Sequence, residues 1–250
     1  MAGQLNGKIA VVTGGSSGIG LAAAKRFAAE GATVYITGRK QEALDAAVGV
    51  IGGNVVAVRA DSSSLADLAK LYSVIRERSG RIDVLYANAG IAAFAPVQGV
   101  TEEHYDNLVD TNLKGTVFTV QQAIPLLSDG ASVILTSSTA GYKGMEAFGI
   151  YSATKAAIRQ LARSWLIDLK QKKVRVNVIS PGMVDTPAID GLAGDPATAS
   201  GMKAHFASQT PLGKIARPED IAAAALFLAS DESGHVNGVD LPVDGGAGQI

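Results

Sequence analysis

The sequence contains no cysteine, and its 250 residues include only three histidines. The lack of cysteine excludes disulfide bonds, thiolate catalysis and zinc sites built on sulfur. His104, His205 and His235 are scattered and share no ligand spacing. We therefore expect no metal site in this chain.

Long apolar runs and a strong net charge are also missing. No segment offers the roughly 18 uninterrupted apolar residues that a membrane span needs, and the first eight residues lack the pattern of a secretion signal. The formal net charge of −1 gives no general electrostatic reason to bind nucleic acid or an anionic membrane. We expect a cytoplasmic protein whose partners are small molecules or copies of itself.

Aromatic residues are scarce, whereas glycine and alanine are abundant. Aromatic residues supply 5% of the chain and hydrophobic residues 47%, which suits close packing of helices on a sheet better than a β-sandwich. No linker, charge run or change in composition divides the sequence. We therefore expect a single domain over residues 1–250.

Short apolar runs alternate with longer segments of helical period. The predicted strands are 8–13, 33–37, 55–60, 84–87, 132–137, 175–180 and 240–246, and the predicted helices are 18–30, 41–50, 65–79, 102–127, 150–171 and 221–229. This order indicates an α/β fold of Rossmann type, with a doubly wound parallel sheet of seven strands and helices on both faces. Residues 185–211, rich in Gly, Ala, Pro and Thr, break the alternation, and we expect an irregular insert that serves as a substrate lid.

A glycine-rich turn follows the first predicted strand. Gly14, Gly18 and Gly20 allow a tight turn in which backbone N–H groups at a helix start face a phosphate. After the second predicted strand, where NAD-binding proteins usually carry an acidic residue, this chain has Arg39 and Lys40. Arg39 can bind a 2′-phosphate through its planar fork, and Lys40 adds a positive charge, so the sequence favours NADP(H).

Three polar side chains predict proton transfer. Tyr151 and Lys155 are four residues apart in a predicted helix and so project from the same face, while Ser138 follows the strand 132–137. A free tyrosine has a pKa of about 10, and a nearby ammonium favours the phenolate. The Ser138 hydroxyl can hold a substrate oxygen beside the phenol.

In these features the chain resembles the short-chain dehydrogenase/reductase family along nearly its whole length. The motifs that carry the resemblance are Thr13–Gly20, Asn88–Ala89–Gly90, Asn112, Ser138, Tyr151 with Lys155, and Pro181–Gly182. The resemblance implies that Tyr151 exchanges the proton with the carbonyl or alcohol. It also implies that Ser138 polarises the substrate oxygen and that Lys155 lowers the Tyr151 pKa and holds the nicotinamide ribose. Asn112 would support a water that leads protons from Lys155 to solvent.

The resemblance further implies a cofactor site along the carboxyl edge of the sheet. Asp61 would contact the adenine, although Ser62 after it and Ala87 before Asn88 depart from the family pattern. The implied cofactor contacts are Gly14, Ser16, Ser17, Gly18, Ile19, Gly20, Arg39, Lys40, Asp61, Ser62, Asn88, Ala89, Gly90, Tyr151, Lys155, Pro181, Gly182, Val184 and Thr186. Family members usually pair as homotetramers, and we expect the same here.

The expected reaction is hydride transfer between NADP(H) and a ketone or secondary alcohol. We expect an apolar substrate pocket that favours an uncharged, hydrophobic ketone, as in the similar bacterial NADPH-dependent alcohol dehydrogenases, lined by Phe94, Tyr142, Met145, Phe148 and Leu192. The alternatives are a 3-oxoacyl thioester reductase or a sugar dehydrogenase of the same family, or a non-catalytic nucleotide sensor. Lys203 is the only positive charge in the lid, which disfavours a carrier-bound thioester, and the Tyr151 and Lys155 pair disfavours a sensor.

Overall fold

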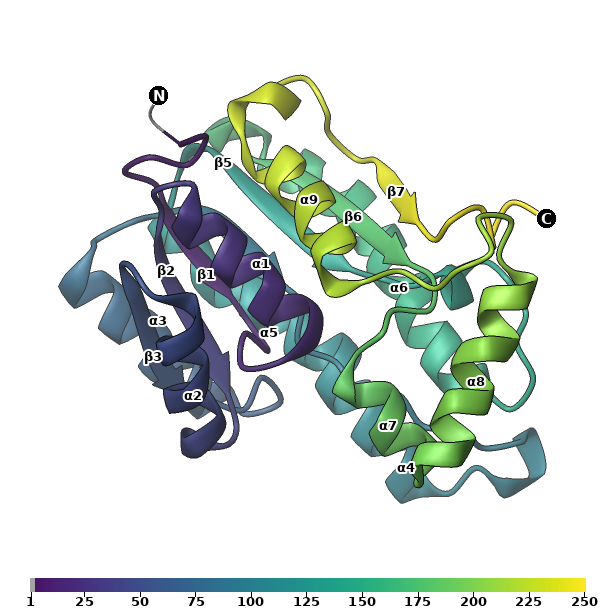
Figure 1. Cartoon of the computed structure of the whole chain (residues 1–250). Helices are drawn as coiled ribbons and strands as arrows, with labels where there is room; N and C mark the ends of the chain where they lie inside the picture. Colours follow the sequence, from purple (N-terminus) through teal and green to yellow (C-terminus); the bar gives the residue numbers. More distant parts are fainter. Residues whose placement is uncertain (1–2) are drawn as a thin grey trace.

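Seven strands form one sheet in the computed structural model, which describes residues 3–250 (Figure 1). The strands are β1 (Ile9–Val12), β2 (Thr33–Gly38), β3 (Val55–Arg59), β4 (Ile82–Ala87), β5 (Leu127–Thr136), β6 (Arg175–Pro181) and β7 (Asp240–Val243). Their order is β3-β2-β1-β4-β5-β6-β7, and every neighbouring pair is parallel. This confirms the predicted Rossmann-type sheet.

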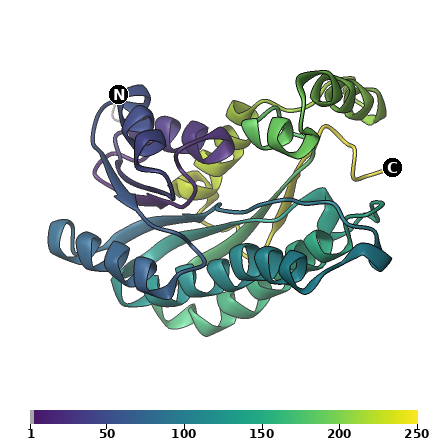
Figure 2. The same ribbon diagram turned by 90° about the horizontal axis from the view of Figure 1, so that it is seen from below.

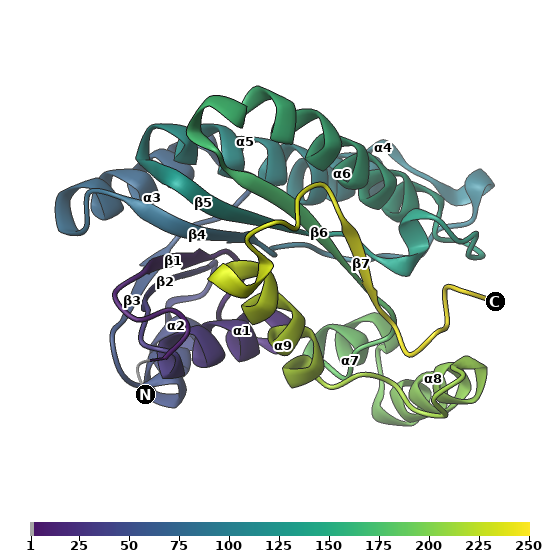
Figure 3. The same cartoon turned by 90° about the horizontal axis from the view of Figure 1, so that it is seen from above.

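Helices cover both faces of the sheet (Figures 2 and 3). One layer contains α3 (Leu65–Arg78), α4 (Glu102–Leu108), α5 (Gly115–Ala123) and α6 (Gly149–Asp168). The other contains α1 (Gly18–Ala29), α2 (Gln41–Ile51), α7 (Pro187–Ala193), α8 (Pro196–Gln209) and α9 (Pro218–Ala229). Successive strand residues point to opposite faces, so Val11 packs in the first layer's core while Ala10 and Val12 pack in the second.

The helical run predicted over 102–127 is interrupted. After α4 the chain makes a π-helical turn, Val109–Lys114, before α5 begins, and a 3₁₀ turn at Ile124–Leu126 leads into β5. Pro125 lies in that last turn and has no N–H to continue the α-helix. The π-helical turn contains Asn112, which is fully buried. Such turns frequently occur at functional sites.

Residues 185–211 were expected to be irregular, and this prediction is wrong because they form α7 and α8. Pro187 and Pro196 occupy first helical turns, and the Asp195 carboxylate accepts hydrogen bonds from the N–H groups of Ala197 and Thr198, both at 3.0 Å. These are strong helix-start signals. Lys203 then joins the two helices, with its Nζ 3.1 Å from Asp190.

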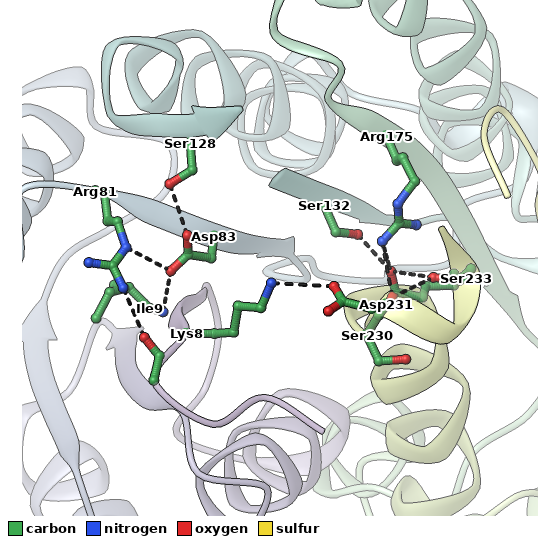
Figure 4. Close-up of polar contacts among 12 residues, drawn as sticks. Lys8, Ile9, Arg81, Asp83, Ser128, Ser132, Arg175, Ser230, Asp231 and Ser233 are labelled. Carbon is green, nitrogen blue, oxygen red and sulfur yellow. Dashed lines mark hydrogen bonds and ion pairs between the residues drawn. The ribbon is translucent and has the colours of Figure 1, made fainter. Parts of the chain in front are cut away.

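Polar contacts tie the strands together at their amino ends (Figure 4). The Asp83 carboxylate in β4 accepts hydrogen bonds from Ile9 N at 2.8 Å, Arg81 Nε at 3.1 Å and Ser128 Oγ at 2.8 Å. Further along this edge, Arg175 Nη2 donates to the carbonyl of Leu228 at the end of α9, at 2.9 Å. The Asp83 contacts thus link β1, β4 and β5, and the Arg175 contact joins β6 to α9, at the amino ends of the strands.

In the part of the chain that the structure describes, no helix has the length and apolar character needed to cross a bilayer. Within residues 3–250, no three His, Cys, Asp or Glu side chains lie close enough together to hold a metal ion.

Candidate active site

A cavity of about 580 Å³ lies at the carboxyl ends of the strands. The loops that follow β1 to β6 contribute to its wall, and α7 and α8 close one side. Of the residues predicted to bind the cofactor or to catalyse the reaction, those that line the cavity are Gly14, Ser16, Ser17, Gly18, Ile19, Arg39, Asp61, Ser62, Asn88, Ala89, Gly90, Ser138, Tyr151, Lys155, Pro181, Gly182, Val184 and Thr186. Gly20, Lys40 and Asn112 are not part of the wall.

The glycine-rich turn between β1 and α1 forms one end of the cavity. Gly14 and Gly18 have φ angles of +67° and +52°, which other residues rarely adopt. Gly20 packs against the turn so closely that a Cβ would lie 2.2 Å from the Gly14 carbonyl oxygen. The Gly15 N–H donates to Thr37 O at 2.9 Å and holds the turn beside the end of β2. The turn therefore exposes backbone, and the start of α1, to the cavity.

The loop after β4 is bound to the end of β1. Thr13 Oγ1 accepts hydrogen bonds from Asn88 N at 3.0 Å and Ala89 N at 3.1 Å, and Asn88 Nδ2 donates to Thr13 O at 3.1 Å. Asn88 thus ties two strands together in addition to lining the cavity. The sequence did not reveal the role of the Thr13 hydroxyl, because the contact joins residues 75 positions apart.

The adenine end expected from the sequence has an uneven charge. Arg39 is exposed on the wall, and within residues 3–250 it has no ion-pair partner. Asp61 is the one carboxylate among the described lining residues, and its Oδ1 accepts hydrogen bonds from Ser63 N at 2.9 Å and Ser63 Oγ at 2.8 Å. The loop after β2 therefore offers a free cation and no acid, which suits a phosphate better than a neutral hydroxyl pair.

Ser138, Tyr151 and Lys155 meet in the cavity. Ser138 follows β5, and α6 carries Tyr151 and Lys155 one turn apart. Lys155 Nζ donates to Thr136 O at 3.0 Å and lies 5.6 Å from the centroid of the Tyr151 ring. Lys155 is only 3% exposed. The hydrogen bond to a backbone carbonyl of the central sheet holds its ammonium in place.

Burial shifts the pKa values of both titratable groups. It lowers the pKa of the Lys155 ammonium to about 8. It also raises the pKa of the Tyr151 phenol, and a hydrogen bond with Ser138 opposes that rise. Burial is the main influence on the Tyr151 pKa in this structure, and the lowering of that pKa by Lys155 stays a prediction.

Asn112 lies behind this group. Its Oδ1 accepts a hydrogen bond from Ile91 N at 2.8 Å, and its Nδ2 donates to Ile91 O at 2.9 Å and to Thr154 Oγ1 at 3.4 Å. The side chain therefore joins the loop after β4 to α6. A Cβ added at Gly90 would lie 3.2 Å from Asn112 Oδ1 and 3.3 Å from Lys155 Nζ, so these groups are close neighbours. The proton-relay role of Asn112 stays a prediction.

The rest of the cavity is mostly apolar. Met145, Phe148 and Leu192 line it as predicted, but Phe94 and Tyr142 do not, so that part of the prediction is wrong. Tyr142 instead packs against Arg159, whose guanidinium carbon is 4.8 Å from the ring centroid, and its hydroxyl donates to Asp244 at 3.4 Å. The structure adds three lining residues of α8, a helix the sequence did not predict: His205, Phe206 and Gln209.

Comparison with known proteins agrees with this geometry. A family model described as Enoyl-(Acyl carrier protein) reductase matches residues 14–248. The chain is 45% identical to the oxidoreductase asL5 of Sarocladium schorii, over 99% of this chain and 98% of that one. It is 40% identical to an NADP-dependent (R)-specific alcohol dehydrogenase of Lentilactobacillus kefiri, over 98% of each chain.

A solved structure has the same fold. The structure is titled a short-chain dehydrogenase/reductase, glucose/ribitol dehydrogenase, of Brucella melitensis, and it matches with a TM-score of 0.92 and 31% identity over 99% of both chains. The chain belongs to the short-chain dehydrogenase/reductase family, as its motifs suggested, and is an oxidoreductase of that family.

The glycine turn leads to a test of dinucleotide binding. Gly20→Ala places a methyl group against the Gly14 carbonyl, so the turn must move, and we expect affinity for a nicotinamide dinucleotide to fall at least about tenfold. Gly49→Ala is the matched control. Gly49 lies in α2, and a Cβ added to it meets no atom within 4 Å. It should leave affinity unchanged and raise the free energy of unfolding by about 0.5–1 kcal/mol. Titration calorimetry and urea unfolding measure both, and unchanged affinity in a folded Gly20→Ala protein contradicts the assignment.

Proposed function

We propose that this protein is an NADP(H)-dependent oxidoreductase that interconverts an uncharged, hydrophobic ketone and its secondary alcohol. One observation carries the proposal: a single cavity joins the glycine turn and Arg39 to Ser138, Tyr151 and Lys155, beside an apolar wall. The residues at the first end fit a phosphorylated dinucleotide, and the polar group fits a carbonyl oxygen. When bound, the reduced cofactor supplies the hydride.

The chain's own groups manage the oxygen and the proton. The Ser138 hydroxyl and the Tyr151 phenol are neighbours in the cavity, where together they can hold the substrate oxygen. During reduction Tyr151 donates its proton to that oxygen, and a raised pKa keeps the phenol protonated for this step. Lys155 places a positive charge beside the developing alkoxide, which stabilises negative charge in a poorly hydrated site.

The preference for NADP(H) rests on the loop after β2. Arg39 lines the cavity, and Ser16 lies beside Gly38, since a Cβ at Gly38 would be 2.8 Å from Ser16 Oγ. A guanidinium and a hydroxyl at this place can bind a 2′-phosphate. The similarity to the NADP-dependent Lentilactobacillus alcohol dehydrogenase supports the same choice.

A second candidate is a sugar or polyol dehydrogenase. His205 and Gln209 face the cavity from α8 and give one side of the substrate region hydrogen-bonding groups. The structural neighbour titled glucose/ribitol dehydrogenase makes this candidate worth testing. Turnover of polyols in preference to hydrophobic alcohols would favour it.

We also propose that the protein forms a homotetramer. Ile167 on α6 is 59% exposed and Tyr105 on α4 is 48% exposed, and both helices lie on the same layer. Apolar side chains on the outer face of paired helices support an interface between copies of the chain.

Replacing Arg39 tests the choice of cofactor. Arg39→Leu should raise the KM for NADPH about 10- to 100-fold, because a charge-assisted hydrogen bond to phosphate contributes roughly 1.5–3 kcal/mol, while the KM for NADH changes little. Lys40→Met provides the comparison, since Lys40 does not line the cavity and should have a smaller effect. Initial rates with both cofactors measure this, and equal losses for NADPH and NADH would refute the 2′-phosphate contact.

Replacing Tyr151 tests the proton transfer. Tyr151→Phe should lower kcat at least about 100-fold, because general acid–base groups contribute roughly 10²–10⁴ in rate, while cofactor affinity is kept. Tyr142→Phe is the matched control, because the Tyr142 hydroxyl bonds to Asp244 outside the cavity wall. Retention of more than a few per cent of activity by a folded Tyr151→Phe protein would show that another group handles the proton.

A further inference from the structure

The Tyr151 ring is the last of three aromatic rings in contact. Phe148 stacks on Tyr151 with ring centroids 4.3 Å apart and an interplanar angle of 28°. Phe94 packs on Phe148 with centroids 4.7 Å apart and an angle of 33°. Phe148 is 7% exposed and lines the cavity, whereas Phe94 is 43% exposed and does not. The row therefore runs from the surface, through Phe148, to the phenol.

Backbone contacts hold the two phenylalanines together. Ala147 has a φ of +55°, one of only two positive values among the non-glycine residues of 3–250. Its carbonyl accepts a hydrogen bond from Ala95 N at 2.7 Å, which joins the loop after β4 to the loop before α6. Phe94 directly precedes Ala95, and Phe148 directly follows Ala147. A strained conformation of this kind persists only where its surroundings hold it, and such residues cluster at functional sites.

The start of α6 sets the phenol between two neighbours. Phe148 is the N-cap of α6 and its carbonyl accepts a hydrogen bond from Ser152 N at 2.9 Å, so the first turn is closed. Tyr151 follows Phe148 by three residues, and Lys155 follows Tyr151 by four, with its Nζ 5.6 Å from the Tyr151 ring centroid. Residues at these spacings share one helix face. Rotation of the Tyr151 ring toward Phe148 would push Phe148 into Phe94.

We infer that Phe148 is a positioning residue: its ring, backed by Phe94 and held by the Ala95–Ala147 hydrogen bond, fixes the Tyr151 phenol in the direction of Ser138. The inference rests on the proposed role of Tyr151 in proton transfer. A displacement of about 1 Å at a reacting group can cost about 100-fold in rate. The ring also covers one side of the phenol and keeps water away from it.

The effect of Phe148 on the Tyr151 phenol can be separated from the effects of the charged groups that line the cavity. The Lys155 Nζ lies 5.6 Å from the Tyr151 ring centroid, and it donates to the Thr136 carbonyl at the end of β5 and not to Phe148. Lys143 also lines the cavity, but its Nζ donates to Ala247 O at 2.8 Å and Ile250 O at 3.0 Å. The remaining lining charges, Arg39 and Asp61, belong to the loops after β2 and β3, and the lining histidine, His205, belongs to α8. A change at Phe148 thus alters the packing and hydration of the phenol and not its charged neighbours.

The decisive experiment compares two cavity-lining rings. Phe148→Leu should lower kcat at least about tenfold with a smaller change in KM, and Phe148→Tyr, which keeps a ring, should recover most of the loss. Phe206→Leu removes a ring of α8 from the same wall and should change mainly KM. Phe227→Leu, on the outer face of α9 and 39% exposed, should change neither. Equal effects of Phe148→Leu and Phe206→Leu would overturn the inference.

The pH profile of alcohol oxidation separates positioning from simple packing. In Phe148→Leu, water reaches the phenol and the pKa of Tyr151 falls, so the rate should begin to rise at a lower pH than in the wild type. An ultraviolet difference titration of the protein alone, against Tyr151→Phe, should show the same downward shift. An unchanged profile and titration, in a protein whose circular dichroism shows it to be folded, would reject the role of Phe148.

A second variant guards against misfolding, and Tyr151→Phe separates the two proposals. Phe94→Leu leaves the cavity wall intact and should shift kcat and the pH profile in the same direction as Phe148→Leu, by a smaller factor. An active Tyr151→Phe protein would refute the proposed function itself. An inactive Tyr151→Phe protein with fully active Phe148→Leu and Phe94→Leu proteins would refute only the positioning role.

Discussion

All seven strands of the sheet run in the same direction, and the site depends on this constraint. Parallel strands place all their carboxyl ends at one edge, so the loops that follow β1 to β6 meet there although they are far apart in sequence. Each loop brings one part of the site: the glycine turn, Arg39, Asp61, Asn88 with Gly90, Ser138, and Pro181 with Gly182. At the opposite edge, the Asp83 contacts join β4 to β1 and β5, and Arg175 joins β6 to the end of α9.

Backbone carbonyls and amides at this edge position the polar side chains. The Thr13 hydroxyl accepts two N–H groups of the loop after β4, the Thr136 carbonyl accepts Lys155 Nζ, and Asn112 bonds to both backbone groups of Ile91. Because these partners belong to the sheet or to its connecting loops, they hold Lys155 and Asn112 in fixed positions relative to the core. Polar side chains that are already fixed in place reduce the reorganisation that a reaction needs.

The sequence predicted the sheet and most of the residues that line the cavity, because both depend on local signals. Apolar runs mark the strands, and the spacing of Gly14, Gly18 and Gly20 needs only a strand before it and a helix after it. The helices of residues 185–211 were missed because Gly, Ala, Pro and Thr give little hydrophobic period, although Asp195 with Pro196 is a readable start signal. The π-helical turn at Asn112 was hidden within a continuous helical pattern.

Other features had no local signal. Tyr142 lies outside the cavity wall because it contacts Arg159 on α6 and Asp244 after β7, which are far from it in the sequence. The pKa of Tyr151 depends on how deeply the phenol is buried, and the position of Lys155 depends on the Thr136 carbonyl. The left-handed conformation of Ala147 is one that alanine seldom adopts, so only the structure reveals the contact that presents Phe148 to the phenol.

The central claim is that one cavity holds a nicotinamide and a ketone together with Tyr151. Isotope transfer tests it most directly: the protein is supplied with NADPH deuterated at the transferable position and with an aryl ketone, and the product is analysed by mass spectrometry. We predict an alcohol that carries deuterium on its carbinol carbon, formed by the wild type and not by Tyr151→Phe. A protein that binds NADPH but returns all the ketone unreduced, across aryl, alkyl and sugar carbonyls, would contradict the account.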